Sequence, residues 1–227
     1  MNFADIFYPE NPKMRETLIR KSQEIVELMK NNFRATNQLI DVLKEHLGLR
    51  FNPITLNESA TVKANCDVLI QRIREIQTRL EKIDKELVEK LEPDLYEKLK
   101  TRDLSIPERA KVSEVLRGIQ CGFAGLVAPF VVGWLFQNVA ILAGITVTCE
   151  LIATGLLGCV VFGVLLMGIE MIFQGILGSI ERDRLKQALK EYEDALEDFR
   201  PASEKYQDSI TEVKLTIKRM ANMNELS

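Results

Sequence analysis

Residues able to do covalent or metal chemistry are scarce in this sequence. His46 is the single histidine, so histidine triads and histidine metal clusters are excluded. The cysteines Cys66, Cys121, Cys149 and Cys159 lack the clustered spacing of a disulfide framework or a zinc site. We therefore expect buried free thiols in a reducing compartment. Palmitoylation of Cys121, which lies near a polar boundary, is the alternative.

Two glycine-rich stretches, GIQCGFAG and GLLGCVVFG, could cradle a phosphate only in the right context. No Lys-Ser/Thr pair follows them and no strand precedes them, so a phosphate loop is not predicted. Acidic residues alternate with Lys and Arg as on solvated helix faces, and basic residues form no nucleic-acid stripe. No acid, base and nucleophile occur at workable spacing. We predict no enzyme, no catalytic or metal-binding residue, no cofactor and no small-molecule substrate.

Charge divides the chain into three parts. Residues 1–117 hold 21 basic and 20 acidic side chains, and residues 181–227 hold 9 and 11. Residues 118–180 hold only Glu150 and Glu170, together with all but one of the 12 glycines. The net charge of −3 gives no field that would attract nucleic acid. We predict an N-terminal helical coiled-coil region, an apolar membrane segment and a C-terminal coiled-coil helix with these boundaries.

Periodic apolar residues in both flanks predict long amphipathic helices and an all-α fold. The first helix should begin at Asn11 and stop at Gly48, a residue suited to a helix C-terminus. Its apolar stripe is interrupted at Asn32. Further along, Glu92-Pro93 should end a helix, and Ser105-Ile106-Pro107-Glu108 offers another helix start.

Two heptad seams predict long helix-to-helix packing of the coiled-coil kind. One covers residues 62–87 and the other residues 185–220, both in alternating steps of four and three. Ser203 is the one weak core position of the second seam, and Pro201 beside it should kink the helix. The partner of each seam can be another helix of the chain or a second copy.

The apolar segment is long enough for membrane spans, which need about 20 mainly apolar residues. Residues 151–169 supply the best span, and residues 118–136, with Pro129 in the middle, supply a possible second one. A seam two positions wide per heptad cannot also cover such a segment, so lipid should cover it. We therefore predict a glycine-rich helical hairpin in a membrane.

The direction of insertion follows from the basic residues, which crowd both ends of the apolar segment and are absent inside it. This favours two spans with both chain ends in the cytosol. A single span over residues 151–169 is the alternative, with a cytosolic C-terminal tail and a translocated N-terminal region. Only then could the sequon at Asn57 be glycosylated. We interpret Glu150 and Glu170 as markers of the membrane boundary.

Short pieces along the chain also match a known vertebrate family in order. They include Tyr8-Pro9-Glu10-Asn11-Pro12-Lys13, His46-Leu47-Gly48, Asn65-Cys66-Asp67, Leu91-Glu92-Pro93 and Ser203-Glu204-Lys205-Tyr206. In these pieces the chain resembles single-pass membrane and coiled-coil domain-containing protein three. The resemblance implies one membrane span, coiled coils and no assigned molecular function, and it offers no catalytic residue to carry over.

Together these patterns predict a non-enzymatic integral membrane protein whose coiled-coil helices mediate association with a protein partner or oligomerisation. The expected partners are the lipid bilayer and a protein, which can be a second copy of the chain. Two alternatives are an α-helical membrane-perturbing or pore-forming-like protein and a soluble helical bundle with a buried apolar hairpin. The sequence does not indicate which membrane is involved.

Overall fold

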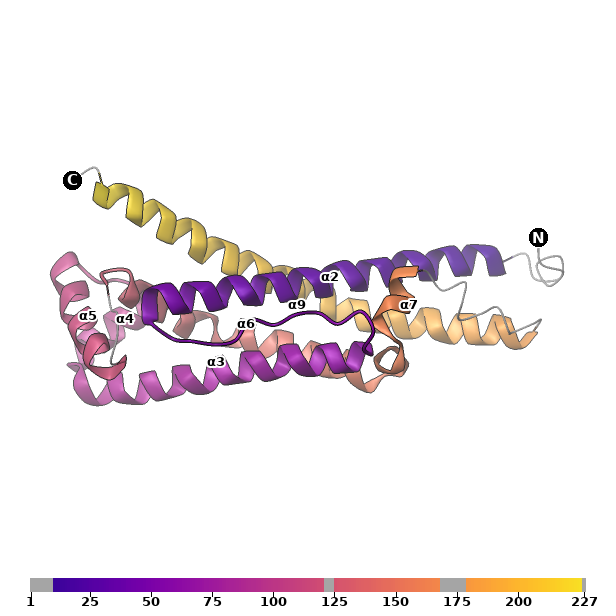
Figure 1. Cartoon of the computed structure of the whole chain (residues 1–227), viewed down its shortest axis with the longest axis horizontal. Helices are drawn as coiled ribbons and strands as arrows, with labels where there is room; N and C mark the ends of the chain where they lie inside the picture. Colours follow the sequence, from indigo (N-terminus) through magenta and orange to yellow (C-terminus); the bar gives the residue numbers. More distant parts are fainter. Residues whose placement is uncertain (1–9, 121–124, 168–178, 226–227) are drawn as a thin grey trace. The chain divides into compact units, whose positions relative to one another are not determined.

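The computed structural model describes residues 10–120, 125–167 and 179–225 (Figure 1). Apart from one isolated bridge, the regular elements of these residues are helical, which confirms the all-α prediction. They are α2 (Asn11–Leu47), α3 (Val62–Lys90), α4 (Pro93–Thr101), α5 (Ile106–Gln120), α6 (Ala128–Thr154), the 3-10 helix η1 (Leu156–Cys159), α7 (Phe162–Met167) and α9 (Ser179–Glu225).

Helix α2 begins and ends where the sequence predicted. Asn11 is its first residue, and Gly48 follows its last residue with a φ of 66°. Glycine adopts this left-handed conformation without steric cost, so the helix stops there. The Leu49 amide then donates to the Leu43 carbonyl (3.1 Å), a bond that satisfies one of the last carbonyls of the helix.

Side-chain oxygens mark the starts of α3 and α5. The Thr61 hydroxyl accepts a hydrogen bond from the Ala64 amide (3.1 Å) at the start of α3. At the start of α5, the Glu108 carboxylate accepts from the Ser105 amide (2.8 Å) and the Ser105 hydroxyl (2.7 Å). A glutamate reaching back to the residue before a helix satisfies an amide that has no helical partner. The predicted helix start at Ser105 is confirmed.

Packing groups the chain into two compact units, and each unit takes pieces of α2, α3, α6 and α9. Unit 1 comprises Met1–Phe33, Thr55–Ile70 and Ile145–Glu204, and unit 2 comprises Arg34–Ile54, Gln71–Gly144 and Lys205–Ser227. Each unit combines residues from all three parts of the sequence that differ in charge, residues 1–117, 118–180 and 181–227.

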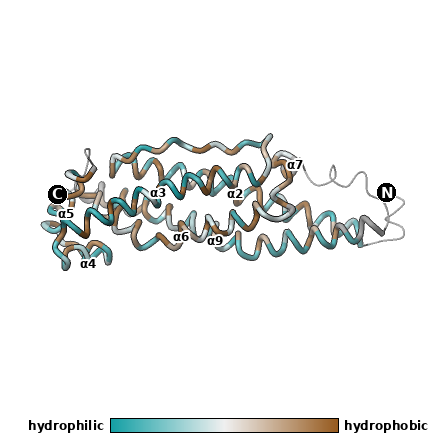
Figure 2. Tube along the Cα trace, turned by 90° about the horizontal axis from the view of Figure 1, so that it is seen from below, coloured by the Kyte–Doolittle hydropathy of each residue, from teal (hydrophilic) through white to brown (hydrophobic). Residues whose placement is uncertain are grey.

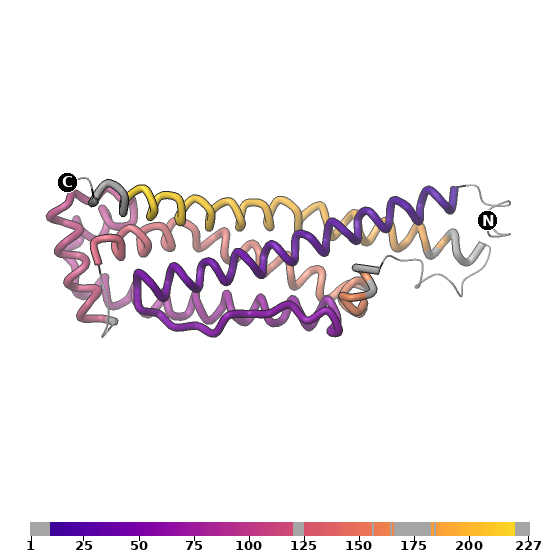
Figure 3. The backbone as a smooth tube through the Cα atoms, turned by 45° about the horizontal axis from the view of Figure 1, so that its top comes forward, coloured from indigo at the N-terminus to yellow at the C-terminus, as the bar shows by residue number. Residues whose placement is uncertain are grey.

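In unit 1, α2 and α9 lie side by side and run in the same direction (Figure 3). Lys21 forms an ion pair with Glu193 (3.3 Å), and the Asn32 amide donates to the Ser203 hydroxyl (2.9 Å). Asn32 interrupts the α2 stripe and Ser203 interrupts the α9 seam, and both side chains are fully buried. The two irregularities of the sequence therefore satisfy each other, as buried polar groups must.

In unit 2, the same two helices contribute a second buried polar pair. The Thr36 and Tyr206 hydroxyls lie 2.8 Å apart, and both residues are fully buried. The heptad seam of α3, which contributes to both units, is buried as well. Its residues are at most 5% exposed: Val62, Cys66 and Leu69 in unit 1, and Ile73, Ile76, Leu80, Ile83 and Leu87 in unit 2. The residues that the sequence assigned to helix packing thus lie in the interior of the chain's own units.

The apolar segment forms its helices at other positions than predicted. Residues 151–169 are not one helix, because α6 ends at Thr154 and is followed by η1 and α7. Residues 118–136 are not one helix either, because α5 ends at Gln120 and α6 begins at Ala128. The continuous span predicted over residues 151–169 is therefore wrong, and α6 is the helix with the length and composition of a candidate span.

Proline and glycine explain both breaks. Pro129 is the second residue of α6, where a missing amide proton costs nothing, so it starts a helix instead of interrupting one. After α6 the chain turns back so tightly that a Cβ on Gly158 would lie 2.2 Å from the Ala153 carbonyl oxygen. Only glycine fits there, and the helical path cannot continue.

Candidate functional site: the apolar helix α6 and the pocket at its start

Helix α6 is the one helix in the described residues that is long and apolar enough to cross a membrane. It has 27 residues, and Glu150 is the single charged residue among them. Figure 2 shows the contrast with α2, α3 and α9, whose hydrophilic and hydrophobic residues alternate along their length. About 44% of its most apolar stretch is buried, so the fold covers α6 only in part. The core helix of a soluble protein would pass the same test of length and composition.

One side of α6 carries large apolar side chains that the chain does not cover. Val139 is 41% exposed, Val147 is 53% exposed and Leu151 is 55% exposed. At about 100° per residue, these three positions fall within one third of the helix circumference. The exposed side of α6 is therefore mainly apolar, with Glu150 as the one charged residue in the same sector. Such a face is typical of one that meets lipid or another apolar surface.

In unit 1, the covered side of α6 packs against α3. Cys66 on α3 and Cys149 on α6 interact with each other, and both residues are fully buried. Just beyond α6, the chain pairs with the residues that precede α3. The Val62 amide donates to the Val160 carbonyl (2.8 Å), and the Phe162 amide donates to the Ala60 carbonyl (2.8 Å). These backbone bonds fasten the end of the apolar helix to the start of α3.

In unit 2, α4 approaches the first half of α6 at very short range. A Cβ on Gly133 would lie 2.5 Å from the Leu99 carbonyl oxygen, so glycine is required for this contact. One turn later, the Gln137 amide donates to the Lys100 carbonyl (2.8 Å). Helix α4 is thereby fixed on α6 by the close backbone approach at Gly133 and by the Lys100 carbonyl, one of the last carbonyls of α4.

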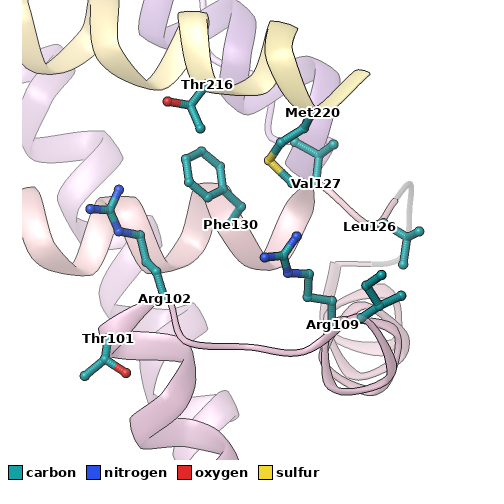
Figure 4. Close-up of a pocket in the computed structure, with 9 residues that line it drawn as sticks. Thr101, Arg102, Arg109, Leu126, Val127, Phe130, Thr216 and Met220 are labelled. Atoms are coloured by element: carbon teal, nitrogen blue, oxygen red, sulfur yellow. The ribbon is translucent and has the colours of Figure 1, made fainter. Parts of the chain in front are cut away.

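A pocket of about 630 Å³ lies in unit 2 beside the first turn of α6 (Figure 4). Arg102 and Arg109 supply its charge, and Phe130, Leu126 and Met220 supply apolar walls. The Arg102 guanidinium lies 5.8 Å from the centre of the Phe130 ring, within cation–π range. The Arg109 Nε donates to the Leu104 carbonyl (3.1 Å), which fixes the direction of that side chain. The pocket thus combines two cations with hydrocarbon surface.

The residues singled out for chemistry are not assembled into a reactive centre within the described parts of the chain. His46 lies half-buried in the last turn of α2, and burial lowers the pKa of its imidazole, although the nearby Glu45 opposes this effect. Cys159 is exposed. The described residues contain no group of three or more His, Cys, Asp or Glu that could hold a metal. Cys121 and Glu170 lie outside the described residues.

Sequence reasoning did not identify Arg102 as a site residue and treated Arg109 only as one of several basic residues near the apolar segment. A single arginine at the end of a short helix has no local pattern that separates it from a solvated surface charge. The pocket becomes visible only in the folded chain, where Phe130 and Met220 line it together with Arg102. Met220 is more than a hundred residues away from Arg102 in the sequence.

Comparison with known proteins adds one family assignment. No solved structure matches the chain. The family model described as protein of unknown function (DUF4533) matches residues 14–175, which is well over half of the chain. By this match, the chain belongs to the DUF4533 family of proteins of unknown function.

Proposed function

We propose that this protein is a non-enzymatic membrane protein in which α6 contacts the bilayer and the paired helices α2 and α9 stay outside it. The uncovered apolar side of α6 carries this proposal. Exposed valine and leucine side chains along one side of a nearly uncharged helix are unfavourable in water, and burying them in lipid removes that cost.

The contacts between α2 and α9 restrict how the chain can cross a bilayer. Lys21 pairs with Glu193, and Asn32 pairs with Ser203, so the two helices must lie on the same side. A single crossing by α6 would separate them. The paired fold therefore allows an even number of crossings: none, with α6 lying in the membrane surface, or two, with the chain returning after α6. The single span implied by the resemblance requires the pair to open.

Under this proposal both chain ends lie on the cytosolic side. Asn57 is exposed and its side chain accepts a hydrogen bond from the Ser59 amide (2.9 Å), but it would remain unmodified on that side. A glycosidase-sensitive shift in mass would place the N-terminal region in the lumen and would contradict the same-side arrangement.

We further propose that the helices outside the membrane associate with a protein partner. The predicted seams are filled by the chain's own residues, so a partner would bind the outer faces of these helices. Val88 on α3 and Leu215 on α9 are more than half exposed and are candidate contacts. This part of the proposal rests on the resemblance and on such exposed apolar residues.

Carbonate extraction of cell membranes, together with flotation of the purified full chain on phosphatidylcholine vesicles, tests the membrane proposal. We expect the wild-type protein to float, and we expect Val139→Lys with Val147→Lys, both exposed and nearer the middle of α6, to abolish flotation. Each lysine costs about 3 kcal/mol at the centre of a membrane helix. Val68→Lys with Val88→Lys, at exposed positions of α3, is the matched control and should still float.

The two parts of this experiment also separate surface binding from crossing. A protein that floats but is released by carbonate lies in the membrane surface, whereas one that resists carbonate crosses the bilayer. A stable, detergent-free monomer that binds no vesicle would overturn the membrane proposal and leave a soluble bundle.

A further inference from the structure

The charge of the pocket beside α6 is not neutralised within the described chain. Neither Arg102 nor Arg109 forms an ion pair with a carboxylate of the described residues. Glu108, next to Arg109 in the sequence, is held by Lys98 at 2.9 Å. Two guanidinium groups facing one hollow favour an anion with several oxygens, because each group can donate two parallel hydrogen bonds to a phosphate or carboxylate.

The remaining walls of the pocket are hydrocarbon. In Figure 4, Phe130 lies between the two arginines, Met220 lies near Phe130, and Leu126 lies on the far side of Arg109. Ile106 is 73% exposed and Leu126 is 46% exposed, although both are large apolar residues. A small inorganic anion would leave these surfaces in water. A ligand that joins an anionic group to a hydrocarbon chain would use both parts of the pocket.

The backbone at Arg102 gives an independent sign that its side chain is used. Its φ is 61°, in the left-handed region at the end of α4, where glycine is the favoured residue. A residue with a Cβ in this region costs roughly 1–2 kcal/mol. The chain nevertheless carries a long cationic side chain there, and such strained positions concentrate at ligand sites. The Arg102 stem also lies 3.1 Å from where a Cβ on Gly133 would be, so it is held against α6.

The position of the pocket indicates the source of the anion. Phe130 is the third residue of α6, the helix that we propose to contact the bilayer. Basic pockets at the end of a membrane helix bind acidic lipid headgroups, since these groups lie at that level. We propose that Arg102 and Arg109 bind the phosphate of an acidic phospholipid, whose hydrocarbon lies against Phe130, Leu126 and Met220. This inference rests on the proposed membrane function.

The test uses the full chain in neutral detergent, with bound lipid measured by native mass spectrometry. We expect phosphatidate to bind about tenfold more tightly than phosphatidylcholine, because one charge-assisted contact of 1.4 kcal/mol has this effect. Arg102→Gly with Arg109→Gln should remove the preference. The glycine substitution suits the left-handed backbone, so loss of binding would not reflect misfolding.

Lys82→Gln with Lys85→Gln removes the same amount of charge from exposed positions of unit 2 and is the matched control. An equal loss of preference in this control would show a diffuse charge effect and overturn the pocket. Competition by inorganic phosphate as strong as that by phosphatidate would show a free phosphate site and overturn the lipid assignment.

Failure of this inference is distinguishable from failure of the membrane proposal. A protein that floats on neutral vesicles but shows no preference for phosphatidate is membrane-bound without an acidic-lipid site. A protein that binds phosphatidate in detergent but floats on no vesicle has the pocket without the membrane function, which overturns the lipid source proposed for it.

Discussion

Gly133 has no side chain, and this allows α4 to pack directly against α6. Adding a Cβ would place it 2.5 Å from the Leu99 carbonyl oxygen, a backbone atom that cannot move aside alone. We expect Gly133→Ala to lower the free energy of unfolding by about 1–3 kcal/mol, the usual cost of overpacking. Urea unfolding followed by circular dichroism measures this change.

Gly144→Ala is the matched control on the same helix, because a Cβ there meets no atom within 4 Å. It should raise the stability by up to about 1 kcal/mol, the difference in helix propensity between glycine and alanine. Equal stability of the two variants would show that α4 does not lie against α6 at Gly133.

Arg102 gives a prediction of opposite sign. Arg102→Gly relieves the left-handed backbone, worth roughly 1–2 kcal/mol, and loses a cation–π contact with Phe130 worth about 0.5–1 kcal/mol. We expect a net increase in stability of about 0.5 kcal/mol, visible as a higher melting temperature. Arg102→Ala keeps the strain and loses the contact, so it should melt below the wild type.

At the scale of helices, the two buried polar pairs set the register between α2 and α9. A double-mutant cycle with Thr36→Val and Tyr206→Phe measures how strongly one pair contributes. We expect a coupling energy of about 0.5–3 kcal/mol, because the side chains are in contact and fully buried. Additive effects of the two substitutions would show that these helices are not paired in this register.

The start of α5 predicts a dependence of stability on pH. The Ser105 hydroxyl and then Lys98 lower the pKa of Glu108 from its ordinary 4.5 to about 2. The carboxylate is therefore favoured in the folded state. Its contribution is present above pH 4.5 and is lost as the pH falls through about 2. Glu108→Gln should flatten the free energy of unfolding over this interval, as urea unfolding at each pH would measure.

The helices flanking the apolar segment could be predicted because their signals are local. Asn11, Gly48 and Ser105 mark helix ends through capping and backbone preferences that neighbouring residues decide. The meeting of Asn32 with Ser203 could not be predicted, since it joins residues 171 positions apart. In the sequence, Asn32 and Ser203 are each visible only as a polar residue within an apolar stripe. The stripes do not indicate whether their partner is another helix of the chain or a second copy.

For the whole molecule, cysteine accessibility reports whether α6 stays packed on α3. In a Cys121→Ser protein without lipid, a maleimide should label the exposed Cys159 quickly and the buried Cys66 and Cys149 only after unfolding. Insertion of α6 into vesicles would separate it from α3 and should make Cys66 reactive. Rapid labelling of Cys149 in the absence of vesicles would show that this packing is not maintained.

The burial of part of the apolar segment by neighbouring helices was the property of the molecule that the sequence predicted least well. Narrow seams indicated that the flanking helices could not shield it, yet α4 and α3 cover part of α6. Part of that cover depends on Gly133, which admits a neighbouring backbone, and on Gly158, which lets the chain turn back after α6. Hydropathy and heptad spacing contain no information about such close approaches of backbone segments. They therefore predicted a continuous span over residues 151–169.

The parallel contact between α2 and α9 also governs the order of events during synthesis. Asn32 pairs with a residue 171 positions later, so the apolar stripe of α2 has no α9 to pack against until α9 has been synthesised. Helix α6 leaves the ribosome before α9 does, at about 5–20 residues per second. During those seconds, the partly folded chain and the membrane-targeting machinery of the cell compete to bind the exposed apolar side of α6. Slowing translation after Thr154 should therefore send more of the newly made chains to membranes.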